Sequence, residues 1–329
     1  MSKILIAGGG GFIGGHLAGK LLAEGHEVVV ADVKPFDQWY QKFDQATNIC
    51  SNLEEKTACL EAAKGCDTIY NLACNMGGMG FIANNRALCM LSVLINTHLL
   101  MAAKEVGAKK FLYSSSACVY AEEHQTVAAN VSLKEPDAYP AMPENGYGWE
   151  KLFSERLCTH FYEDFGLQVR IVRFHNVYGP NGTWDGGREK APAALCRKIA
   201  LAKQTGNLEL EIWGDGEQSR SFMYIDDCLT GLEKLMASDF AEPINLGRSE
   251  LVTINQLLDI IEGIVGVKVD RKYNLDAPQG VRGRNSDNTL IKETLGWEPA
   301  IDLKSGLERT YPWIEEQLLR RSRGETVID

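Results

Sequence analysis

A glycine-rich turn near the amino terminus constrains the fold of this chain more than any other feature. An apolar segment, residues 3–7, leads into the run Gly8-Gly9-Gly10-Gly11-Phe12-Ile13-Gly14, and a helical pattern follows. Glycines spaced as G-x-x-G-x-x-G permit a tight turn, a close approach of the backbone to a pyrophosphate, and packing of the helix on the strand. Because Asp32 ends the next apolar segment, about 20 residues further on, the unit predicts a dinucleotide site.

Asp32 also indicates which dinucleotide the site takes. A carboxylate at this position accepts hydrogen bonds from the diol of an adenosine ribose and repels a 2′-phosphate. The sequence therefore favours NAD over NADP. The alternative, a turn residue at the end of a strand, stays open.

Strand and helix patterns alternate through the first half of the chain. Residues 66–73 and 109–113 are predicted strands, and residues 84–106 are predicted to form one long helix. Such alternation is typical of a parallel, doubly wound sheet. A length of 329 residues predicts two lobes. We expect an α/β Rossmann-type domain, residues 1–175 with about 210–240, and a smaller mixed substrate lobe, residues 176–209 and 241–329.

Composition and charge bear on the partners of the chain. A net charge of −10 argues against binding to nucleic acid, which needs a basic surface. The amino-terminal residues show no charged leader, cleavage site or membrane-spanning run, so we expect a cytoplasmic protein without a membrane partner. The nine cysteines stand singly, which predicts reduced core thiols and no metal site. Residues 320–329 are predicted to be a frayed tail.

Polar side chains follow the strand predicted at residues 109–113. Ser116 and Cys118 come next, which places them at the carboxyl edge of the sheet, where open α/β folds bind ligands. Tyr147 and Lys151 lie four residues apart and therefore share one face of the predicted helix 147–165. A nearby ammonium stabilises a phenolate, so we expect a lowered pKa for Tyr147. A buried inert thiol and an exposed helix face are the alternatives.

These motifs resemble the extended short-chain dehydrogenase/reductase family, whose sugar-nucleotide members oxidise a hexose hydroxyl with tightly held NAD. Further matches cover nearly the whole chain, and the closer resemblance is to the branch that epimerises GDP-mannose at C3 and C5. The matching segments are 75–82 (NMGGMGFI), 115–118 (SSAC), 173–180 (RFHNVYGP), 186–194 (GGREKAPAA), 213–216 (WGDG) and 280–288 (GVRGRNSDN).

The resemblance implies epimerisation of GDP-mannose to GDP-L-galactose and GDP-L-gulose through a transient 4-keto sugar. Ser116, Tyr147 and Lys151 would serve the oxidation and reduction at C4. Cys118 and Lys190 would be the base and the acid that exchange protons at C3 and C5. Related 4,6-dehydratases carry an aspartate and a glutamate after the catalytic serine or threonine, whereas this chain carries Ala117 and Cys118, which favours epimerisation without loss of water.

The resemblance also implies two sets of binding residues. The cofactor set is Gly8, Gly11, Phe12, Ile13, Gly14, Asp32, Asn52, Leu72, Tyr147 and Lys151. The substrate set is Gly77, Gly78, Ser116, Ala117, Cys118, Asn176, Glu189, Lys190, Lys198, Gln218, Arg220 and Arg284. Within it, arginine offers a planar fork for a diphosphate and lysine a point charge. A homodimer built on the two long helices is a further implication.

Three residues depart from the pattern of that branch. Asn52 stands where an aspartate would meet the adenine, Asn75 replaces an aspartate, and Ala121 replaces a proline. The last two border the sugar pocket, so an epimerase acting on another nucleotide sugar, or at C4 only, stays open. A non-catalytic NAD-binding regulator is the alternative from a different class.

Two further predictions concern residues of structural importance. His175, at the end of a predicted strand, is expected to be packed rather than catalytic. Asp226 or Asp227 is expected to cap the helix that follows.

Overall fold

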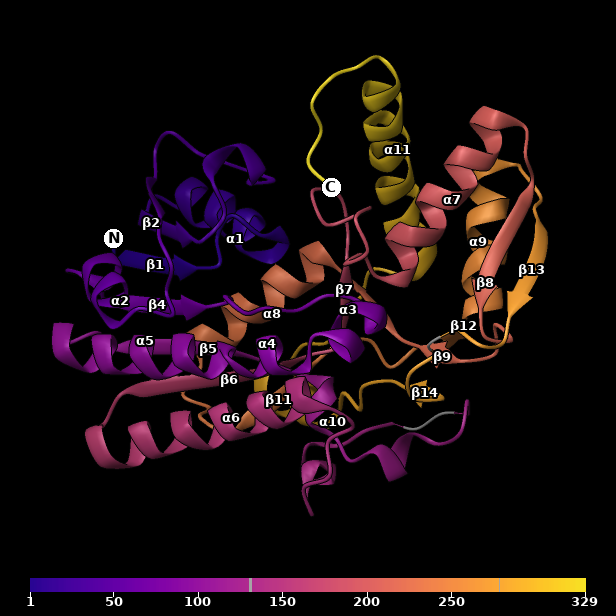
Figure 1. Cartoon of the computed structure of the whole chain (residues 1–329). Coiled ribbons are helices and arrows are strands. Elements are labelled where there is room, and N and C mark those ends of the chain that lie inside the picture. The colour runs from indigo at the N-terminus through magenta and orange to yellow at the C-terminus, as the bar shows by residue number, and fades with distance from the viewer. Residues whose placement is uncertain (130–131, 278) are drawn as a thin grey trace.

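The computed structural model describes residues 1–129, 132–277 and 279–329, and a seven-stranded parallel sheet forms its centre (Figure 1). This arrangement confirms the predicted Rossmann-type α/β class. From one edge to the other the strands are β11 (Pro243–Leu246), β6 (Gln168–Phe174), β5 (Lys110–Ser116), β4 (Thr68–Asn71), β1 (Lys3–Ala7), β2 (Glu27–Asp32) and β3 (Thr47–Cys50).

The central strands are apolar on both faces because helices cover both sides of the sheet. Along β1, Ile4 and Ile6 face one core, whereas Leu5 and Ala7 face the other. The helices α1 (Phe12–Ala23) and α8 (Ile225–Ala237) lie on the first face. The second face is covered by α2 (Lys56–Ala63), α5 (Ser92–Val106) and α6 (Gly146–Phe165), of which α5 and α6 run side by side in Figure 1.

A smaller group of helices and short strands lies beside the sheet, at the right of Figure 1. It contains α7 (Ala191–Thr205), α9 (Ile254–Val265), α11 (Leu303–Ser322) and the parallel pair β8 (Glu209–Trp213) and β13 (Asp270–Asn274). The remaining short elements are β7 (Asn176–Tyr178), β10 (Phe222–Tyr224), β9 (Ser219–Arg220), β12 (Val252–Thr253), β14 (Gly283–Arg284) and α10 (Thr289–Leu295), and the 3-10 turns are η1 (Phe36–Gln38), η2 (Ala117–Val119), η3 (Glu122–Gln125) and η4 (Glu135–Ala138).

The strand pairing bears on the predicted domain limits. β11 joins the central sheet although its residues, 243–246, follow the predicted return segment 210–240. β8, within that segment, pairs with β13 of the smaller group instead. The domain boundaries themselves stay a prediction.

The prediction of one long helix over residues 84–106 is wrong. The segment forms α3 (Met79–Asn84), α4 (Arg86–Met90) and α5, which are separated at Asn85 and Leu91. Asn85 has non-helical angles (φ −129°, ψ 43°), and its side-chain amide donates to the carbonyl of Phe81. By length and composition alone, Arg86–Val106 could cross a membrane, and 44% of its most apolar window is buried within the fold.

Neither Asp226 nor Asp227 caps α8, which corrects the sequence prediction. Both carboxylates lie within the first turn, after the N-cap Tyr224. Asp227 instead accepts the backbone N–H of Ile301 at 2.8 Å, and Asp226 pairs with Arg309 at 3.2 Å. First-turn acids still interact favourably with the helix dipole.

The predicted frayed tail is also ordered. α11 continues to Ser322, and the chain then turns back towards the centre of the molecule (Figure 1). There the indole N–H of Trp184 donates to the carbonyl of Ile328 at 2.7 Å. This contact holds the last residues against the loop that leads to α7.

Candidate active site

The turn between β1 and α1 is crowded, and backbone atoms exclude a side chain at Gly8 and at Gly14. Gly8 has a φ of 82°, and a Cβ there would lie 2.7 Å from the backbone nitrogen of Ala73. A Cβ at Gly14 would lie 2.4 Å from the carbonyl oxygen of Gly8. The first turn of α1 therefore lies close to the end of the sheet, with its backbone accessible to a phosphate-bearing ligand.

Asp32 ends β2 and supports this turn. Its carboxylate accepts the backbone N–H of Gly10 at 3.1 Å and that of Lys34 at 3.0 Å. The predicted cofactor residues Phe12 and Ile13 pack partly buried at the start of α1. Leu72 continues β4, and its N–H donates to Ala7. The side-chain oxygen of Asn52, after β3, accepts the N–H of Glu54 at 3.0 Å.

β5 delivers Ser116 and Cys118 to the carboxyl edge of the sheet. The Ser116 hydroxyl accepts the backbone N–H of Cys118 at 3.2 Å, which caps the short turn η2. Cys118 is buried in a small cluster with Tyr147, Cys89 and Ile82. Ala117, between the two polar residues, is buried as well.

The start of α6 lies directly against this turn. Asn145 caps the helix by accepting the N–H of Gly148 at 3.2 Å. A Cβ at Gly148 would lie 2.1 Å from the carbonyl oxygen of Cys118, so only glycine permits the approach. Tyr147 and Cys118 are thereby brought into one cluster.

Lys151 lies one turn beyond Tyr147 and is fully buried. Its ammonium donates to the carbonyl of Ser114 at 2.9 Å and lies 3.8 Å from a carboxylate oxygen of Glu150. It is 5.6 Å from the centre of the Tyr147 ring. Tyr147 and Lys151 therefore project together, as helical spacing predicts.

The predicted lowering of the Tyr147 pKa is wrong. Burial raises the pKa of Tyr147 well above its usual range, and the hydrogen bond from Ser116 opposes this only in part. Burial also acts to lower the pKa of Lys151, but Cys74 and Glu150 outweigh it, so the pKa of Lys151 is raised and the ammonium is retained.

Lys190 immediately precedes α7, a helix of the smaller group beside the sheet. Burial lowers the pKa of Lys190, and the Cys118 thiol opposes that shift. The loop that carries Lys190 is joined to the segment before α3, because the N–H of Gly78 donates to the carbonyl of Arg188 at 3.0 Å. Glu189 is held by Arg197 at 3.0 Å.

Gly77 and Gly78 allow this loop and the α3 segment to lie close together. A Cβ at Gly77 would be 2.8 Å from Cβ of Phe81, and one at Gly78 would be 2.6 Å from the carbonyl oxygen of Glu189. The guanidinium of Arg188 lies 3.9 Å from the centre of the Phe81 ring. Both glycines therefore help to place Lys190.

Two arginines lie side by side on neighbouring short strands. Arg284 of β14 is in register with Arg220 of β9. Arg284 donates to the sulfur of Cys118 at 3.3 Å. Burial lowers the pKa of Arg220 to about 10, and the Arg284 charge adds to this effect. Two adjacent guanidinium groups are suited to an anionic ligand such as a diphosphate.

Three other predicted substrate residues, on β7, on α7 and directly before β9, already use part of their hydrogen-bonding capacity. Asn176 donates to Ser221 at 3.1 Å, Lys198 donates to Glu211 at 2.6 Å, and Gln218 donates to Trp213 at 2.8 Å. The side-chain oxygen of Gln218 is buried and has no hydrogen-bond partner within residues 1–129, 132–277 and 279–329. The geometry thus gathers Ser116, Cys118, Tyr147, Lys151, Lys190 and Arg284 most closely.

Sequence reasoning missed three residues at this site. Cys74 follows β4 at the same sheet edge and packs against the Cys118 cluster, so the strand-end rule applied to Ser116 could have found it. Gln125 and Glu144 contact Arg284, and no local pattern marks them. Within the part of the chain that the structure describes, no group of three or more His, Cys, Asp or Glu side chains could hold a metal ion.

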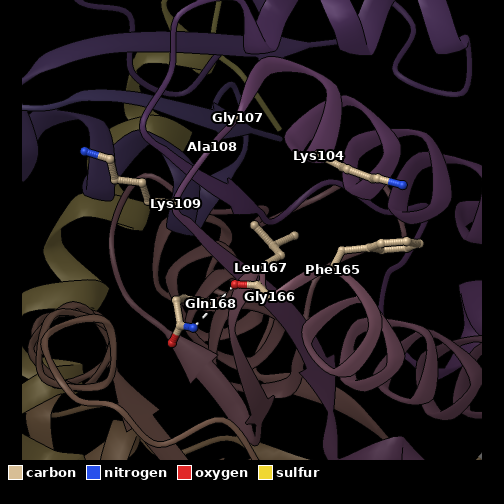
Figure 2. A pocket seen from close by; sticks show the side chains of 8 residues that line it. All are labelled: Lys104, Gly107, Ala108, Lys109, Phe165, Gly166, Leu167 and Gln168. Carbon is tan, nitrogen blue, oxygen red and sulfur yellow. Dashed lines mark hydrogen bonds between the residues drawn. The ribbon is translucent and has the colours of Figure 1, made fainter.

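A hollow of about 320 Å³ lies at the opposite ends of these strands (Figure 2). It is bordered by Gly107 and Gly166, which end α5 and α6, and by Lys104, whose ammonium is 3.5 Å from the centre of the Phe165 ring. Ligands of doubly wound sheets bind at the carboxyl ends of the strands. The Cys118 edge is therefore the candidate site.

Comparison with known proteins identifies the family of this chain. The model of the NAD dependent epimerase/dehydratase family matches residues 4–247. A rice protein (Oryza sativa subsp. japonica) named GDP-mannose 3,5-epimerase 1 is 48% identical over 320 residues, which cover 96% of this chain and 82% of that protein. An Arabidopsis thaliana protein named GDP-mannose 3,5-epimerase is 46% identical over 327 residues, 99% of this chain and 85% of that one.

Solved structures share the fold at lower identity. A UDP-glucose 4-epimerase from Thermotoga maritima, solved with UDP-glucose, superposes with a TM-score of 0.81 at 26% identity and covers 96% of this chain and 99% of that one. A UDP-glucuronic acid 4-epimerase from Bacillus cereus in complex with NAD has a TM-score of 0.80 at 26% identity, covering 96% and 97%. The match to the family model and to both plant relatives places this chain in the NAD-dependent epimerase/dehydratase family.

Proposed function

We propose that this protein is a GDP-mannose 3,5-epimerase, which converts GDP-mannose to GDP-L-galactose and GDP-L-gulose with tightly bound NAD. The plant relatives at 46% and 48% identity support the substrate. The turn at Gly8 and Gly14 fits a dinucleotide, because the absence of Cβ atoms lets the first turn of α1 pack against the ends of the strands, where its backbone can approach a pyrophosphate. Asp32, at the end of β2, is placed to bind the adenosine ribose.

Bound NAD supplies reversible oxidation and reduction at C4 of the hexose. Ser116 and Tyr147 hold the C4 oxygen, and Tyr147 takes the hydroxyl proton and later returns it. Lys151, fixed by the carbonyl of Ser114, stabilises the phenolate that this step requires. The C4 ketone is reduced back to a hydroxyl at the end, so the reaction proceeds without net redox change.

A ketone at C4 makes the hydrogens on C3 and C5 acidic. At each carbon, one group removes the proton to leave an enolate, and a group on the opposite face returns a proton and forms the new C–H bond. Cys118 and Lys190 come from different lobes and are suited to opposite faces. The lowered pKa of Lys190 makes its ammonium a stronger acid than an exposed lysine.

The residues next to Ser116 distinguish this reaction from dehydration. Loss of water needs an acid that protonates the leaving hydroxyl, and Ala117 offers none at that position. The observation that carries the proposal is therefore the thiol of Cys118, buried beside Tyr147 and contacted by Arg284.

The test is to incubate the purified protein with GDP-mannose in deuterated water and to follow the sugar ring by proton NMR. We expect deuterium at C3 and C5, and products with galactose and gulose configuration. A Cys118→Ala variant should lose this exchange, whereas the matched variant Cys50→Ala, at an exposed cysteine on β3, should retain it. Full epimerisation by Cys118→Ala would refute the proposal and favour a 4-epimerase, and no exchange into any nucleotide sugar would favour a regulator.

We further propose that the protein is a cytoplasmic homodimer. Its nine cysteines are free, as suits a reducing compartment. Apolar side chains on the outer surfaces of α4, α5 and α6 are exposed and could cover one another in a second copy: Leu88, Met90, Leu91, Leu94, Met101, Trp149, Phe153, Tyr162 and Phe165. Light scattering should give twice the chain mass of 36.4 kDa, and Phe153→Glu should give the single mass.

A further inference from the structure

Gln125 is a buried glutamine whose side-chain amide has a fixed orientation. It ends η3 and is 1% exposed. Its nitrogen donates to the carbonyls of Tyr120 and Ala121 at 3.2 and 3.1 Å. Two carbonyls can accept hydrogen bonds only from the amide nitrogen, so the side-chain oxygen of Gln125 points away from them and towards Arg284. The Nε–H of Arg284 donates to this oxygen.

The anchored Nε sets the direction of the whole Arg284 guanidinium, because that group is planar and rigid. One amino nitrogen, Nη1, donates to the sulfur of Cys118 at 3.3 Å. The other, Nη2, is buried without a hydrogen bond among the described residues. It lies 3.7 Å from a carboxylate oxygen of Glu144, which is also buried without a hydrogen bond.

We propose that Gln125 is a positioning residue for the base of the epimerase, holding Arg284 so that Nη1 contacts the Cys118 sulfur while Nη2, near Glu144 but without a hydrogen bond in the described part of the chain, donates to a substrate oxygen. This inference deepens the proposed function and rests on it for the role of Cys118. A cationic donor beside a thiol favours the thiolate, which is the form that accepts a proton. Buried polar groups without partners mark a place where a ligand completes the hydrogen bonding.

Arg284 is distinguished from the other charged and titratable groups around Cys118 by its direct contact with the sulfur. Lys190 and Arg220 contribute positive charge, and Arg220 donates to the carbonyls of Ser219 and Gln279. Tyr147, Cys89 and Cys74 lie in or against the same cluster as Cys118 and supply no positive charge. Among the described residues, the cation that donates a hydrogen bond to the Cys118 sulfur is Arg284.

The test compares the alkylation of Cys118 in three variants, in the absence of sugar. Gln125→Met removes the acceptor for Arg284 at similar volume, Gln125→Glu keeps the acceptor but loses the two donors, and Gln317→Met removes a buried glutamine from α11 as a control. The protein is treated with iodoacetamide near neutral pH, and mass spectrometry follows the peptide that contains Cys118.

We expect Gln125→Met to slow the alkylation of Cys118 about tenfold, which corresponds to about 1.4 kcal/mol. Gln125→Glu and Gln317→Met should react at close to the wild-type rate. An unchanged or faster rate in Gln125→Met would overturn the proposal. A merely structural role predicts the faster rate, because a loosened site exposes the thiol.

Two further measurements distinguish failure of this inference from misfolding of Gln125→Met and from failure of the proposed function. Gln125→Asn takes the place of Gln125→Met if that variant does not fold. It keeps an amide but shortens the side chain by one methylene, so it should also slow the alkylation of Cys118. A wild-type rate of alkylation in Gln125→Asn would contradict the proposal. With GDP-mannose in deuterated water, Gln125→Met should lower kcat for exchange by a factor similar to that for alkylation. If the wild-type protein shows no exchange while alkylation still depends on Gln125, the proposed function fails and the positioning role stands.

Discussion

Replacing Gly78 with alanine tests how precisely the α3 segment places Lys190. Gly78 has ordinary angles (φ −66°, ψ 176°) that alanine can adopt, so the substitution acts only through its Cβ. That atom would lie 2.6 Å from the carbonyl oxygen of Glu189, whereas real Cβ atoms essentially never come closer than 3.0 Å. The Glu189 backbone, directly before Lys190, and the Gly78 segment must therefore move apart by at least about 0.4 Å.

A displacement of about 1 Å in a catalytic group can cost about 100-fold in rate, so we expect Gly78→Ala to lower kcat about tenfold. The assay is the initial rate of deuterium incorporation from deuterated water as a function of GDP-mannose concentration. The control is Gly263→Ala in α9, where an added Cβ meets no atom within 4 Å. That variant should keep wild-type activity and gain about 0.5 to 1 kcal/mol of stability. A wild-type kcat in Gly78→Ala would refute the reasoning.

Three other perturbations have definite expected outcomes. Burial lowers the pKa of His175 to about 3, so between about pH 6.5 and pH 3 the unfolded chain binds a proton that the folded chain does not. The free energy of unfolding is therefore full above about pH 6.5 and falls by about 1.4 kcal/mol per pH unit towards pH 3. Urea titrations at two pH values should show a smaller loss of stability for His175→Gln than for the wild type. Glu155→Gln breaks the buried pair with Arg173 (2.7 Å) and should cost about 3 to 5 kcal/mol in the same assay, while an unchanged midpoint would contradict this. Asp32→Ala releases two backbone donors, one of them buried, and should weaken NAD binding at least about tenfold by calorimetry, and equal affinity would speak against a ribose contact.

Local patterns were sufficient to predict the scaffold of the site. The glycine turn, the strand that ends at Ser116, and the pair Tyr147 and Lys151 all depend on neighbours within a few residues, and the structure places them at one sheet edge. The long helix predicted over residues 84–106 failed because apolar spacing continues through Asn85, although the backbone there leaves the helical region. Periodicity reports which face is apolar, and it does not report such a break.

Features that depend on distant contacts could not be predicted in this way. Arg284 reaches Gln125 across 159 residues of sequence and Cys118 across 166, and no spacing rule connects them. The same limit explains the wrong direction for the Tyr147 pKa. The nearby Lys151 could be predicted from the sequence, but the burial that outweighs it depends on packing of α6 against η2.

The two close approaches at glycine divide the proposed chemistry into halves that can be tested separately. Gly148 lets α6 bring Tyr147 against the turn that carries Cys118, whereas Gly78 acts on the loop that carries Lys190. Gly78→Ala should therefore impair proton exchange while C4 oxidation, followed by cofactor absorbance, proceeds at close to the wild-type rate. Gly148→Ala, whose Cβ would lie 2.1 Å from the Cys118 carbonyl, should impair both steps. Equal losses of both steps in Gly78→Ala would mean that the segments carrying Tyr147 and Lys190 do not position these groups independently.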